Sequence, residues 1–121
     1  MRHAASDLAL AKLALEREEI LAEQVCFHAQ QAAEKALKTV LVAKQQRFPP
    51  VHDLEQLLEV VRQAHIPLPA WSDALLDLTP YAVETRYPGY WEEITPDERN
   101  RAIELAALAV EWAAAQLAGE R

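Results

Sequence analysis

The sequence has few glycines, only two in 121 residues, and they stand far apart at Gly89 and Gly119. A Walker or Rossmann phosphate loop needs several closely spaced glycines, so this class of nucleotide site is excluded. The sequence also has a single cysteine, Cys26, which excludes an intramolecular disulfide and a cysteine-rich zinc module. We interpret Cys26 as a small core residue, and we expect a reducing, cytoplasmic location.

Positive charge is scarce as well: 12 lysines and arginines stand against 19 aspartates and glutamates, which gives a net charge of -7. This balance argues against a generally basic nucleic-acid binder. Charged residues interrupt every long apolar window, so we expect no membrane-spanning segment. The histidines are scattered and no Glu-x-x-His pair occurs, so we expect neither a metal nor another cofactor.

What is present is a sequence rich in alanine and leucine, with 51% hydrophobic residues, whose apolar positions recur at helical spacing. The pattern predicts an all-α fold, a helical bundle in one domain covering residues 1–121. The predicted helices run from about 6 to 19, 22 to 44, 53 to 64, 69 to 87 and 95 to 119. Within the fourth of them, Pro80 predicts a kink or break near Leu78.

The second predicted helix has two distinct sides. One side carries four alanines that would let another helix approach closely, within the domain or across a dimer: Ala29, Ala32, Ala33 and Ala36. The other side carries a polar strip: His28, Gln31, Lys35 and Lys38. This strip is interpreted either as an ordinary solvated face or as part of a ligand-binding surface.

The last predicted helix has the clearest start. Thr95 is the expected N-cap, Pro96 the first helical residue and Glu98 the partner in a capping box. Gly119 is expected to end the helix. The predicted buried stripe consists of Ile103, Ala106, Ala107, Val110, Ala114 and Leu117.

An aromatic cluster precedes that helix, with four aromatic residues between Tyr81 and Trp91 around Arg86. Arginine offers a planar fork for phosphate, and a tyrosine such as Tyr87 offers a face on which a base can stack. The cluster is therefore a candidate site for a nucleotide or RNA. The alternative is a hydrophobic loop plug that an Arg86–carboxylate pair holds in place.

Three motifs resemble the HEPN domain family (higher eukaryotes and prokaryotes nucleotide-binding): residues 26–38 (CFHAQQAAEKALK), 52–54 (HDL) and 85–88 (TRYP). The resemblance extends over nearly the whole chain. It implies an antiparallel up-and-down bundle of four long helices plus a short one, usually forming a homodimer with a cleft. It also implies a minimal nucleotidyltransferase as partner, in a toxin–antitoxin-like pair.

Some members of this family are metal-independent ribonucleases with an Arg-x4-6-His signature, in which the two side chains activate a ribose 2′-hydroxyl and stabilise the cyclising phosphate. Arg86 resembles the arginine of that signature and is the candidate catalytic residue. Trp91, Glu92 and Glu93 occupy the positions at which the histidine is required. The sequence therefore leaves open whether the protein is an enzyme.

A second Arg-x4-His spacing, from Arg47 to His52, spans Pro49-Pro50 in a connector, where the two side chains share no helix face. We attribute it to chance. His52 is interpreted either as a support for the start of the third helix, which Asp53 caps, or as a histidine lining a cleft near Arg86.

The hypothesis from the sequence is a dimeric HEPN subunit that binds a nucleotide or RNA and pairs with a nucleotidyltransferase. The predicted ligand-binding residues are Arg86, Tyr87, His52, Asp53, Lys35 and His28. One alternative is an endoribonuclease toxin that uses Arg86 with a histidine from elsewhere. The other is a purely structural helical adaptor.

Overall fold

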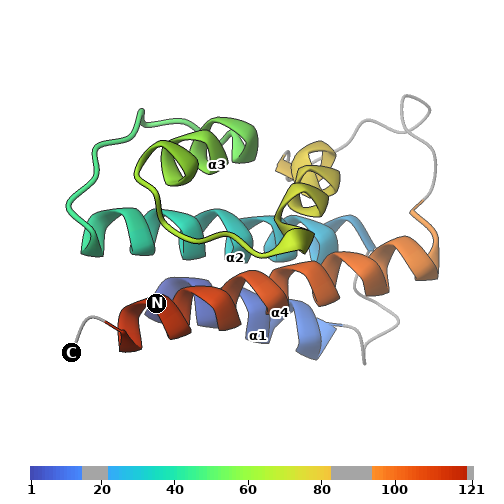
Figure 1. The fold of residues 1–121 in the computed structure, drawn as a ribbon. Helices are drawn as coiled ribbons and strands as arrows, with labels where there is room; N and C mark the ends of the chain where they lie inside the picture. Colours follow the sequence, from blue (N-terminus) through green and yellow to red (C-terminus); the bar gives the residue numbers. More distant parts are fainter. Residues whose placement is uncertain (15–21, 83–93, 120–121) are drawn as a thin grey trace.

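A computed structural model describes residues 1–14, 22–82 and 94–119 of the chain (Figure 1). This part contains five helices and no strand: α1 (Arg2–Ala14), α2 (Ala22–Ala43), α3 (Leu54–Gln63), η1 (Ala70–Ala82) and α4 (Pro96–Ala118). The predicted all-helical fold is confirmed. Among the described residues, no helix combines the length and the hydropathy needed to cross a membrane.

Helix α2 is the centre of the fold and contacts all four other helices. Figure 1 shows α1 running antiparallel to α2, while α4 runs in the same direction as α2 because α3 and η1 return the chain between them. Helices α3 and η1 cover the side of α2 that faces away from α1 and α4. The four alanines of α2 are fully buried by this one chain, so the predicted close approach of helices occurs within it.

The two predicted N-caps, Asp53 and Thr95, are confirmed. Asp53 caps α3, because its carboxylate accepts hydrogen bonds from the backbone N–H groups of Glu55 (2.9 Å) and Gln56 (3.3 Å). Thr95 caps α4, and its hydroxyl accepts a bond of 3.1 Å from the N–H of Glu98. Cys26 is buried in the core as expected.

The scarcity of glycine is visible where α2 and α3 end. Both helices end in a left-handed residue that is not glycine, Gln45 at φ 58° and His65 at φ 59°. In the second case the backbone N–H of Ile66 donates to the carbonyl of Val61 at 3.2 Å, which closes the last turn, and the Ile66 side chain is buried. A non-glycine residue in this conformation costs on the order of 1 kcal/mol, which the surrounding contacts offset.

Three local predictions need correction. The chain stays helical through Pro80 to Ala82 instead of breaking near Leu78, because it forms a 3-10 helix. Its i to i+3 bonding avoids the clash that the proline ring makes in an α-helix. The first helix begins at Arg2 rather than near residue 6, and residues 15–19 lie outside the described part of the chain.

The third correction concerns which face of α4 is buried. Of the predicted stripe, Ile103 and Ala106 are buried, Ala107, Val110 and Leu117 are half-buried, and Ala114 is exposed. The buried face also contains Ala102, Leu105, Ala109, Trp112 and Ala113. Trp112 fixes this rotation, because its indole N–H donates a hydrogen bond of 2.9 Å to the carbonyl of Pro67. A large side chain with a buried polar partner outweighs the small alanines in deciding which side of a helix faces the core.

Candidate functional site

Two of the predicted ligand-binding residues meet at an acidic residue of α1. The carboxylate of Asp7, whose side chain is 10% exposed, accepts bonds from His28 Nδ1 (3.0 Å) and Lys35 Nζ (2.5 Å). His28 and Lys35 are seven residues apart on α2, about two turns, and so lie on the same side of that helix. We call Asp7, His28 and Lys35 the Asp7 cluster.

A second cluster is built around Glu34 of α2, whose side chain is only 2% exposed. Its carboxylate accepts hydrogen bonds from Lys38 Nζ (2.7 Å), Gln30 Nε2 (3.0 Å) and His52 Nδ1 (2.6 Å). Burial acts to raise the pKa of Glu34, but the bonds from Lys38, Gln30 and His52 together lower it below its usual value of 4.5. The carboxylate is therefore ionised at neutral pH. We call these four residues the Glu34 cluster.

His52 is the accessible member of the Glu34 cluster, with 72% of its side chain exposed. Because Glu34 is ionised and can only accept, Nδ1 of His52 carries the proton in the neutral ring. The other ring nitrogen, Nε2, then has a free lone pair on the accessible side chain. An imidazole oriented in this way can accept a proton or, once protonated, bind an anion.

Asp53 stands beside His52 in sequence but has a different role. Its carboxylate caps α3 and also accepts a bond of 3.0 Å from the side chain of Gln56. That side-chain bond, with the two backbone bonds of the cap, lowers the pKa of Asp53. The structure thus engages both carboxylate oxygens within the start of α3, while His52 supports the helix start through Glu34 of α2.

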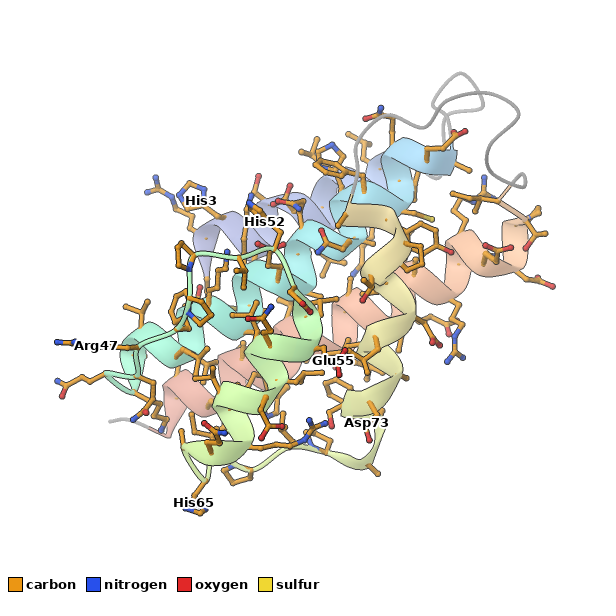
Figure 2. All side chains as sticks on the ribbon, turned by 90° about the horizontal axis from the view of Figure 1, so that it is seen from above. His3, Arg47, His52, Glu55, His65 and Asp73 are labelled. Carbon is orange, nitrogen blue, oxygen red and sulfur yellow. The ribbon has the colours of Figure 1, made fainter. Side chains whose placement is uncertain are left out.

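The other residues considered in the sequence analysis are Arg86, Tyr87, Arg47 and the possible metal ligands. Arg86 and Tyr87 lie outside the described residues. Figure 2 shows Arg47 projecting away from His52, consistent with a chance spacing between the two. Within residues 1–14, 22–82 and 94–119, no three histidine, cysteine, aspartate or glutamate side chains come together in a way that could hold a metal ion.

Beside the two clusters, an open pocket of about 310 Å³ lies between the start of α1 and the second half of α2. It is lined by His3, Lys35, Lys38, Thr39 and Val42. Lys35 belongs to the Asp7 cluster and Lys38 to the Glu34 cluster, so both carboxylates anchor side chains of this pocket.

Sequence reasoning missed three residues of this region: Asp7, Glu34 and His3. Glu34 had a detectable signal in the sequence. It lies on the same side of α2 as the apolar Leu37 and Leu41, where Gln30 is the only other polar residue of the four. A carboxylate in such a position needs buried partners. Asp7 and His3 gave no local signal, since only the packing of α1 against α2 brings them to the site.

The chain matches a known family over nearly its whole length. The family model described as HEPN domain matches residues 1–117. The chain belongs to the HEPN domain family. Comparisons with curated proteins and with solved structures find no match. The HEPN-like motif at residues 26–38 supplies His28 and Lys35 of the Asp7 cluster, and Gln30, Glu34 and Lys38 of the Glu34 cluster.

Proposed function

We propose that this HEPN chain is one domain that acts as a subunit of a nucleotidyltransferase/HEPN toxin–antitoxin-like pair in the cytoplasm. It forms a homodimer and binds a nucleotide or RNA in a cleft near Arg86. Family membership supports the class of protein. The observation that carries the binding function is the pair of buried carboxylates, Asp7 and Glu34, which hold two lysines and two histidines on one side of α2.

The physical reason is preorganisation of positive charge. A lysine ammonium has three N–H donors. Lys35 uses one of them to bond Asp7, and Lys38 uses one to bond Glu34. The remaining donors are held in place before a ligand arrives, and this preorganisation lowers the entropic cost of binding. Because the chain as a whole carries a charge of -7, binding of RNA is expected to be local, modest and strongly weakened by salt.

The test is a titration of the purified protein with ATP and with a short single-stranded RNA. Arg86→Ala and Lys35→Met are each expected to weaken binding roughly tenfold, the loss of one charge-assisted contact. Lys12→Met, which removes an exposed lysine of α1, is the matched control and should stay within about twofold. If the wild-type protein binds neither ligand, the binding function is wrong and the structural adaptor becomes the better interpretation.

Pairing and dimerisation have their own tests. Co-expression with a nucleotidyltransferase encoded beside this gene should yield a complex that co-purifies, and the isolated HEPN protein should sediment as a dimer. A genome neighbourhood without any nucleotidyltransferase would contradict the pairing. A monomer at micromolar concentration would contradict the homodimer.

The second candidate is an endoribonuclease, and the oriented, accessible imidazole of His52 is the observation that favours it. In that reaction His52 Nε2 would take the proton of a ribose 2′-hydroxyl, and the 2′-oxygen would attack the adjacent phosphorus. The bond to the 5′-oxygen would break, which leaves a 2′,3′-cyclic phosphate and a 5′-hydroxyl protonated by solvent. Arg86 would stabilise the charge on the phosphate.

Incubation with total RNA tests this candidate. Cleavage that is lost in both Arg86→Ala and His52→Ala, and retained in the His65→Ala control, would support the ribonuclease. His65 is a suitable control because it is also an exposed histidine, and Figure 2 shows it at a different place on the surface from His52. Cleavage that is absent, or unchanged in His52→Ala, would exclude this role of His52.

A further inference from the structure

The pocket between α1 and α2 is lined by described residues of two helices. The pocket is formed by the start of α1 and the last turns of α2, through His3, Thr39 and Val42. Two further lining residues, Lys35 and Lys38, belong to the Asp7 and Glu34 clusters.

Two ammonium groups on this pocket are fixed but still able to bind. Lys35 and Lys38 have side chains that are 39% and 25% exposed, and each is anchored to a nearly buried carboxylate. Those anchors, Asp7 and Glu34, have their own oxygens occupied by these lysines and by His28, Gln30 and His52. The N–H donors of the two lysines not used by the carboxylates are suited to an anion with several acceptor oxygens, such as a phosphate.

The rest of the pocket is apolar in character and suits a flat organic group. Val42 is a large hydrophobic residue with 66% of its surface exposed, and the methyl group of Thr39 and the lysine stems extend this apolar wall. His3 contributes an exposed imidazole from α1, labelled in Figure 2, whose ring can stack on a planar ligand. A volume of about 310 Å³ is at the lower end of the range for small-ligand pockets.

We propose that this pocket binds a phosphate monoester attached to a planar base, with Lys35 and Lys38 on the phosphate and His3, Thr39 and Val42 around the base. The inference rests on the proposed function, because it takes the ligand to be a nucleotide, and it deepens that function by naming the residues of this pocket. The same chemistry is present in a free nucleoside monophosphate and at the phosphorylated end of an RNA chain. The buried charges of Asp7 and Glu34 keep the affinity modest.

The experiment uses Val42, because no carboxylate anchor is disturbed when it is changed. Isothermal titration with AMP should give binding at least tenfold tighter than with adenosine. Val42→Asp places a negative charge in the pocket and should weaken AMP binding about tenfold, whereas the near-isosteric Val42→Asn should stay within twofold. Leu13→Asp adds the same charge at another exposed apolar position, on α1, and should also stay within twofold.

Location is measured independently by backbone NMR. Addition of AMP should shift the amide signals of Thr39 and Val42 and leave those of α3 unchanged. Comparison of a 5′-phosphorylated with a 5′-hydroxyl trinucleotide separates the two sources of the phosphate. A preference for AMP over both supports the free nucleotide, and a preference for the phosphorylated trinucleotide supports an RNA end.

Equal AMP affinity of Val42→Asp and Val42→Asn overturns the pocket assignment, as does equal binding of AMP and adenosine. If Arg86→Ala weakens binding of AMP while Val42→Asp does not, the proposed function stands and this inference falls. If AMP, ATP and RNA all fail to bind to the wild-type protein, the proposed binding function falls and the pocket assignment falls with it.

Discussion

Glu34 is the side chain whose change tests the site most directly. Its carboxylate is 2% exposed and receives three hydrogen bonds, from Lys38, Gln30 and His52. Glu34→Gln keeps the shape of the side chain but removes the charge and one acceptor oxygen. The new amide oxygen can still accept from Gln30, whereas the new NH2 group must face the ammonium of Lys38 or the ring of His52, both of which are donors.

The expected cost follows from the number and exposure of these bonds. A hydrogen bond to a charged group contributes about 1.5–3 kcal/mol and a neutral one about 0.5–1.5 kcal/mol. Lys38 is 25% exposed and can recover part of its hydration, and His52 is 72% exposed and recovers most of it. We therefore expect Glu34→Gln to lower the free energy of unfolding by about 2 kcal/mol, below the 3–5 kcal/mol typical of a fully buried pair.

Urea denaturation at pH 7 measures this loss, and thermal unfolding should show a melting temperature lower by roughly 6–10 °C. Glu59→Gln is the matched control, because Glu59 is an exposed helical carboxylate that pairs with Arg62 at 3.6 Å. Surface pairs of this kind contribute about 0–1 kcal/mol, so the control should change stability by less than 0.5 kcal/mol. Equal stability of the two variants would refute the structural role assigned to Glu34.

The pH dependence gives a second readout of the same group. The pKa of Glu34 is lower in the folded protein than its ordinary value of 4.5, so the unfolded chain takes up a proton at higher pH than the folded one. Its contribution to stability is therefore fully present above about pH 5 and is lost as the pH falls through the folded pKa. The stability difference between wild type and Glu34→Gln should shrink steadily below pH 4.5, and a constant difference would contradict the assignment.

Three further predictions concern the elements that hold the site. Asp53→Ala removes the N-cap of α3 and should cost about 1 kcal/mol in urea denaturation, whereas Asp53→Asn should cost much less. His65→Gly removes the steric cost of a non-glycine residue in the left-handed conformation after α3, and should raise the free energy of unfolding by about 0.5 kcal/mol. A loss of stability would contradict this prediction. Trp112→Phe removes the donor to the carbonyl of Pro67 and should cost about 1–2 kcal/mol, and a neutral effect would show that this bond does not fix the rotation of α4.

Local features of the fold were predictable because local interactions produce them. The caps at Asp53 and Thr95 depend on a side chain and backbone N–H groups two or three residues further along the chain. The 3-10 form of η1 was not predictable in this way, since the same apolar spacing and the same proline are compatible with a broken α-helix. The buried face of α4 differs from the predicted one because the contact of Trp112 with the distant Pro67 carbonyl contributes more than the burial of several alanines.

The sequence by itself determined the classes of site that are excluded, the helices and their caps, and the motifs that place the chain in the HEPN domain family. Only the tertiary structure decided which distant side chains the polar residues of α2 contact. Lys35 bonds to Asp7, 28 residues earlier, and Glu34 bonds to His52, 18 residues later. Such pairs form because α1 and the connector before α3 pack against α2, and no local spacing encodes a contact between side chains that helix packing alone brings together.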